Sequence, residues 1–210
     1  MQFKIGIRGV VAALAAPAFI ACASTRQNDA VSAAGTLNLP DYAASLNTSE
    51  VGMLQRMTDP NILGHMAMGD SIEIVMAEYA QRRTKNDDVL QFARMMDVDH
   101  SNHINAERSL GVTSGVGIHT LANELKASHM GQMVDSIGPQ ISELKFDRNY
   151  ILAQIQMHEH MLGELEILED VAKNDMVRDH VRATIPVVAA HLDRARAIAK
   201  KYEFGRKPLK

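Results

Sequence analysis

The chain has 210 residues, of which 46% are hydrophobic, enough for one buried core in addition to an N-terminal leader. Its formal net charge is −3, and removal of the leader's two positive charges would take it to −5, which argues against a nucleic-acid-binding protein because such a protein needs a basic face. Aromatic residues make up only 4%, and β-branched residues stand singly rather than in alternating runs, so we predict an all-α protein.

The first 22 residues have the features of a bacterial signal peptide. Lys4 and Arg8 form a positive start, and the apolar run over 9–20 is shorter than the roughly 20 residues that span a bilayer. The run ends at Phe19-Ile20-Ala21-Cys22, which resembles a lipobox, the motif whose cysteine is acylated and becomes the new N-terminus. Acylation of Cys22 would anchor the protein in the outer membrane, facing the periplasm. Ala21-Cys22-Ala23 also fits ordinary cleavage, which would release a soluble periplasmic protein, and both alternatives stay open.

The remaining chain divides by composition into three parts. Residues 23–58 are rich in Ala, Ser, Thr, Asn and Gly without a lasting period, and we predict that they form a flexible tether. The helical domain is expected over 59–204, with Asp59 as its first cap, and a short basic tail over 205–210.

Turn signals divide this domain into four long helices and one short helix. Asn86-Asp87 and Asn174-Asp175 are tight turns that also cap the following helices, and Gly111 is expected to stop the second one. Pro186 falls inside the last helix and should kink or split it. The expected helices cover residues 59–85, 87–110, 119–136, 142–172 and 175–202. Two antiparallel helical hairpins, joined by a crossover that contains the short helix, make a four-helix bundle.

A histidine interrupts the apolar stripe on three of the long helices. Apolar residues recur there at spacings of three and four, as on amphipathic helices, and the interruptions are His100, His158 and His191. Glu73 lies at the border of the stripe on the first helix. Counted from the tight turns at 1.5 Å per residue, Glu73 is level with His100, and His158 is level with His191. We therefore predict that these four residues form a candidate metal-ligand layer.

Two interpretations of this layer stay open. A hydrogen-bonded Glu–His cluster would satisfy the buried groups without metal, in a non-enzymatic structural or stress-related envelope protein. This function is predicted first, because the chain has no phosphate loop, nucleophile elbow or CxxC motif. In the alternative, three imidazoles and one carboxylate bind a single zinc, copper or iron ion, or His and Met side chains bind haem. The many methionines are core filler or, in the same alternative, copper(I) ligands.

Four segments of the predicted domain carry a family resemblance. They are Gly69-Asp70-Ser71-Ile72-Glu73, Phe92-Ala93-Arg94-Met95-Met96-Asp97-Val98-Asp99-His100, the run from Phe146-Asp147-Arg148-Asn149-Tyr150 to His158-Glu159, and Ile185-Pro186-Val187-Val188-Ala189-Ala190-His191-Leu192. In this order they resemble the domain-of-unknown-function 4142 family of exported or outer-membrane bacterial proteins. The resemblance covers residues 60–202 and implies a ferritin-like bundle and export, but no activity. A ferritin-type di-iron centre is not expected, because no Glu-x-x-His falls on the stripes and Asp97-x-x-His100 is the nearest equivalent.

Overall fold

The structure is a computed structural model that describes residues 42–43, 46–118 and 143–205. Within these residues all regular secondary structure is helical, which confirms the predicted all-α class. No helix in the part of the chain that the structure describes is long and apolar enough to cross a membrane. The predicted leader with Cys22 and the predicted short helix over 119–136 lie outside the described residues.

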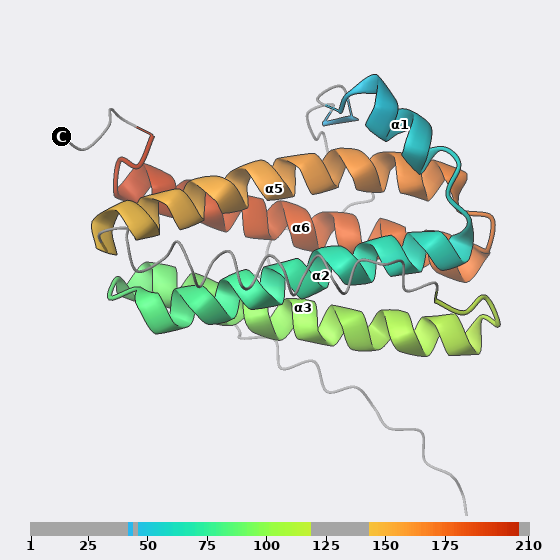
Figure 1. The fold of residues 1–210 in the computed structure, drawn as a ribbon, viewed down its shortest axis with the longest axis horizontal. Coiled ribbons are helices and arrows are strands. Elements are labelled where there is room, and N and C mark those ends of the chain that lie inside the picture. Colours follow the sequence, from blue (N-terminus) through green and yellow to red (C-terminus); the bar gives the residue numbers. More distant parts are fainter. Residues whose placement is uncertain (1–41, 44–45, 119–142, 206–210) are drawn as a thin grey trace, which may run out of the picture. The chain divides into compact units, whose positions relative to one another are not determined.

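Four long helices form two hairpins, as predicted (Figure 1). The first hairpin consists of α2 (Asp59–Arg83) and α3 (Asp87–Thr113), and the second of α5 (Glu143–Val171) and α6 (Asp175–Lys201). The two helices of each hairpin pack along each other, while α3 also contacts α6 and α2 contacts α5. The chain therefore folds as a helical bundle in which every long helix has neighbours in both hairpins.

The two predicted tight turns begin helices by the expected mechanism. The side chain of Asn86 accepts hydrogen bonds from the backbone N–H groups of Asp88 and Val89, and Asn174 does the same for Met176 and Val177. These bonds satisfy backbone donors that have no partner inside the helix. Because each turn is so short, it sets the helix that follows directly antiparallel to the one before.

Asp59 was expected to cap the first long helix, and this detail is wrong. The N-cap is Thr58, and the Asp59 carboxylate instead accepts the backbone N–H groups of Lys173 and Asn174 at 2.9 and 3.2 Å. This carboxylate therefore joins the start of α2 to the turn between α5 and α6. It fixes the two hairpins to each other at one end of the bundle.

The prediction of a flexible tether over 23–58 is wrong for its last part. Residues 48–54 form a short helix, α1 (Thr48–Leu54), which begins with a capping box between Asn47 and Glu50 and packs on α5. Leu54 is fully buried, and the Tyr42 and Leu46 side chains join the same core. The composition suggested a coil, but three apolar anchors and a strong cap are enough to order this segment on the bundle.

Two other boundaries differ from the sequence prediction. The second long helix runs through Gly111 to Thr113, and the chain reverses at Gly115 and Gly117, whose φ angles of 70° and 77° suit glycine. The backbone N–H of Gly117 donates to the Gly111 carbonyl at 2.8 Å, an approach that leaves no room for a side chain at Gly111. The last helix is not split at Pro186, which sits on its exposed side.

A polar layer divides the apolar core into two parts. One part lies around the start of α2 and the α5–α6 turn, and the other around the α2–α3 turn and the C-terminal end of α6. The first includes Ile62, Leu63, Leu165, Leu168 and Val181, and the second includes Phe92, Met96, Tyr150, Ile151 and Ile198. The buried polar residues between them are the ones that the sequence singled out, together with several that it did not.

Candidate metal centre

The three predicted histidines and Glu73 all lie in this polar layer. They come from four different helices: Glu73 from α2, His100 from α3, His158 from α5 and His191 from α6. Glu73 and His158 are fully buried, and His100 and His191 are each 4% exposed. On α2 the predicted stripe is displaced, because Glu73 points inward while Gly69, Ile72 and Met76 are only half-buried at the border.

The three imidazole rings face one another in a nearly equilateral triangle. Their centroids are separated by 6.2 Å between His100 and His158, 5.4 Å between His100 and His191, and 5.5 Å between His158 and His191. One ring nitrogen of each histidine lies within 4.8 Å of those of the other two. The two hairpins therefore share one layer of histidines. Counting residues from the tight turns could compare heights within a hairpin but not between the two hairpins.

Each of these rings has one nitrogen that is held from outside the triangle. Nδ1 of His100 donates to the Asp70 carboxylate at 2.6 Å, and Nδ1 of His158 donates to the Gln154 carbonyl at 2.8 Å. Nε2 of His191 donates to the Asp99 carboxylate at 3.0 Å. The remaining nitrogens, Nε2 of His100, Nε2 of His158 and Nδ1 of His191, are buried and have no hydrogen-bond partner among the described residues. Each outer hydrogen bond fixes a tautomer, and the three inner lone pairs are left facing one another.

The electrostatics of the triangle favour neutral imidazole at its most buried corner. Burial, and next the neighbouring His191, lower the pKa of His158 to about 3. Burial opposes protonation of His100 as well, but the hydrogen bond and charge of Asp70 raise the pKa of His100 above its usual value. The imidazole of His158 is therefore uncharged throughout the neutral pH range.

Glu73 lies on the flank of the triangle, outside the set of three close nitrogens. Its Oε2 accepts a hydrogen bond from Nε2 of Gln154 at 2.7 Å, and its Oε1 lies 3.9 Å from Nδ1 of His158. Burial raises the pKa of Glu73. The structure thus brings three of the four predicted ligands together and places the fourth beside them, where its role as a ligand stays a prediction.

A second polar cluster lies one helical turn further along α3. Asp70 connects it to the triangle, because one carboxylate oxygen accepts from His100 and the other from Nδ1 of His103 at 2.8 Å. His103 stacks on His180 of α6 at 4.7 Å between ring centroids, and its Nε2 bonds to the Thr184 hydroxyl at 2.8 Å. Glu107 is fully buried beside these rings, and burial together with the negative charge of Asp70 raises its pKa to about 10.

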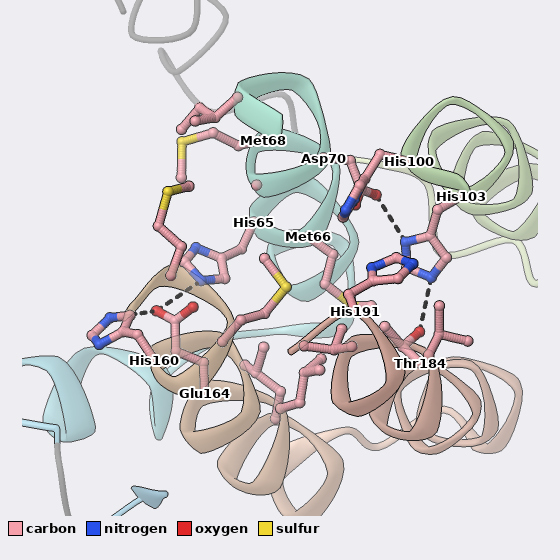
Figure 2. A pocket seen from close by; sticks show the side chains of 18 of the residues that line it. His65, Met66, Met68, Asp70, His100, His103, His160, Glu164, Thr184 and His191 are labelled. Carbon is pink, nitrogen blue, oxygen red and sulfur yellow. Dashed lines mark hydrogen bonds and ion pairs between the residues drawn. The ribbon is translucent and has the colours of Figure 1, made fainter. Parts of the chain in front are cut away.

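A cavity of about 240 Å³ opens beside the triangle (Figure 2). His100 and His191 reach its wall, and Figure 2 shows His65 and His160 on the opposite side, with Nε2 of each within ion-pair distance of Glu164, at 3.2 and 3.6 Å. Four thioethers line it, those of Met66, Met68, Met157 and Met161. A small molecule or ion that enters this cavity therefore reaches two of the three facing rings.

Sequence reasoning did not identify the residues around the triangle. None of Asp70, Asp99, His103, Glu107 and His180 was predicted as a site residue. One available signal was the spacing of His100, His103 and Glu107, which places three polar groups on one face of a helix. Asp97, which was considered with His100, instead accepts a hydrogen bond from Gln81.

One of three comparisons with known proteins found a match, and it agrees with the resemblance in the sequence. The searches of curated proteins and of solved structures found no match to the chain. The family model described as a domain of unknown function (DUF4142) matches residues 43–198, which include α1, α2, α3, α5, all of α6 except its last three residues, and every residue of the polar layer. The chain belongs to the DUF4142 family.

Proposed function

We propose that the protein binds a single transition-metal ion through His100, His158 and His191. The observation that supports this most strongly is the set of three buried ring nitrogens that face one another without hydrogen-bond partners among the described residues. The outer nitrogens, by contrast, are bonded to two carboxylates and a carbonyl. Histidines that bind metals in proteins typically donate their second nitrogen in this way.

The donor set suits zinc, copper or iron. Two nitrogens bound to one tetrahedral zinc at about 2.0–2.1 Å lie about 3.4 Å apart. The facing nitrogens lie within 4.8 Å of one another, so small side-chain rotations would close the triangle on an ion. Three protein ligands leave a fourth position for an exogenous ligand. The thioethers of the cavity would favour copper(I) among these ions.

Haem is a poorer fit than a bare ion. The cavity of about 240 Å³ is smaller than the 300–1,000 Å³ that is typical of pockets for drug-sized ligands. The hydrogen-bonded structural cluster, which the sequence favoured first, also fits less well. Such a cluster would pair its inner nitrogens, and each unpaired buried group costs about 1–3 kcal/mol.

The first test compares two histidines that lie two positions apart on α5. We expect zinc to raise the melting temperature of the chelator-treated protein, because zinc at 100 times its dissociation constant adds about 2.7 kcal/mol to the free energy of unfolding. His158→Gln should make this shift smaller, because it removes one of the three ligands. The matched control His160→Gln, at a side chain that is 44% exposed, should retain it. Scanning calorimetry with and without zinc measures both, and elemental analysis of natively purified protein identifies the ion. A wild-type melting temperature that ignores zinc, copper and chelator would refute the metal site.

We propose that this site works in the bacterial cell envelope. The proposal rests on the charged start, apolar run and lipobox-like end of residues 1–22. We also propose that the chain between residues 113 and 143 connects the two hairpins in the way that is typical of ferritin-like bundles. The site itself differs from a ferritin-type centre, because its inner ligands are imidazoles rather than carboxylates.

A further inference from the structure

The cluster beyond Asp70 contains a second set of metal-ligand atoms. His103, Glu107 and His180 each offer one nitrogen or oxygen, and these three atoms lie within 4.8 Å of one another. Glu107 is 0% exposed, and neither of its carboxylate oxygens has a hydrogen-bond partner among the described residues. Nε2 of His180 is likewise buried without a partner in that part of the chain. A bound ion would satisfy both groups, and its binding would release the proton that the raised pKa of Glu107, about 10, otherwise keeps on this carboxyl group at neutral pH.

We propose that His103, Glu107 and His180 bind a second divalent transition-metal ion, separate from the ion at the three histidines. Two imidazoles and one carboxylate form a donor set that zinc uses in proteins, with one position left open. The proposal goes beyond the first site, because the two sets share no ligand. Asp70 lies between them and contacts one histidine of each.

His103 can serve this ion without leaving another group unpaired. Both of its nitrogens are engaged, one by Asp70 and the other by Thr184. If His103 releases Asp70, that carboxylate keeps its hydrogen bond from His100. If it releases Thr184, that hydroxyl keeps its bond to the His180 carbonyl at 2.9 Å. Either exchange gives up one hydrogen bond and gains a metal bond.

The second site is also open to solvent on one side. The His103 side chain is 21% exposed, and His180 is half-buried, whereas Glu107 is fully enclosed. An ion can therefore approach past the stacked rings of His103 and His180 and meet the carboxylate at the inner end. The rings of the three-histidine triangle, by contrast, are at most 4% exposed.

The test counts tightly held zinc ions in variants that each remove one site. Chelator-treated protein is loaded with zinc, freed of excess zinc by gel filtration and analysed for zinc per chain. We expect two ions in the wild type, one in Glu107→Gln and one in His158→Gln. Glutamine keeps the size and shape of Glu107 but is a poor metal ligand. The control Glu78→Gln changes a half-exposed carboxylate on α2 and should retain two ions.

His180→Gln provides an independent variant of the same site at a half-buried position, in case Glu107→Gln does not fold, and should also hold one ion. One ion in the wild type that is lost only in His158→Gln would overturn the second site and leave the first intact. One ion that is lost in Glu107→Gln and His180→Gln, but kept in His158→Gln, would support the second site and refute the first. Two ions that persist in both Glu107→Gln and His180→Gln would overturn this assignment of ligands.

Discussion

At the scale of single residues, Asp70 is the group that connects the two proposed sites. Its two carboxylate oxygens accept from His100 and His103 at 2.6 and 2.8 Å, and only 3% of the residue is exposed. Burial alone would raise its pKa, but these two hydrogen bonds hold the pKa of Asp70 below its usual value. The ionised carboxylate orients one histidine of each site.

Asp70→Asn should therefore weaken zinc binding at the three-histidine site by roughly 10- to 100-fold, as is typical for the loss of a group that orients a metal ligand. The amide keeps the shape of the side chain but can accept with only one of its two polar atoms. Isothermal titration calorimetry of the chelator-treated protein measures both dissociation constants.

Asp99→Asn is the matched control, because Asp99 orients only His191. Its side chain is 40% exposed, so the change should weaken the three-histidine site alone, and less than Asp70→Asn does. Equal affinities in Asp70→Asn and the wild type would contradict the role given to this carboxylate.

At the scale of elements, the packing of the segment before α1 on α5 depends on a glycine. A Cβ at Gly163 would lie 2.6 Å from the carbonyl oxygen of Tyr42, so the chain before α1 crosses α5 where α5 has no side chain. The neighbouring atoms belong to the backbone and cannot rotate away. Helix propensity alone would favour alanine here, and the close crossing outweighs it.

Gly163→Ala should destabilise the protein by about 1–3 kcal/mol, as expected for overpacking at a tight contact. Gly69→Ala on α2 is the control: its Cβ would meet only the flexible end of Met161 at 3.4 Å, and the change should stabilise the helix by about 0.5–1 kcal/mol. Urea unfolding of the chelator-treated variants compares the two. A stabilising Gly163→Ala would show that the segment before α1 does not pack there.

The helices themselves were predictable because their signals are local. Asn86 and Asn174 cap helices through atoms two and three residues away, so the sequence alone placed both tight turns. The heights of His100, His158 and His191 followed from the same turns. The hydrogen bonds of Asp70 to His100 and of Asp99 to His191 join different helices, 30 and 92 residues apart, and no local pattern encodes them. The α1 segment was missed although its capping box between Asn47 and Glu50 is a local signal, because the apolar contacts with α5 that also order it are not local.

At the scale of the whole molecule, the proposed location depends on Cys22. We expect the wild type to fractionate with the outer membrane and to incorporate radiolabelled fatty acid. Cys22→Ala should move the protein to the soluble periplasmic fraction, because a stable anchor requires the acyl chains. Ser24→Ala, which leaves the cysteine, should behave as the wild type. A Cys22→Ala variant that stays in the membrane fraction would count against acylation at this residue.

Both proposed ions would join the two hairpins of the bundle. The first would be held by α3 on one side and by α5 and α6 on the other, and the second by α3 and α6. Neither hairpin alone contains a complete set of ligands, so an ion can be captured only after the hairpins have docked. Once captured, it would act as a reversible cross-link between residues 100 and 191, and the hairpins could not separate until it left. Metal would then slow unfolding more than it speeds folding, and the lifetime of the folded chain in the envelope would depend on the supply of metal.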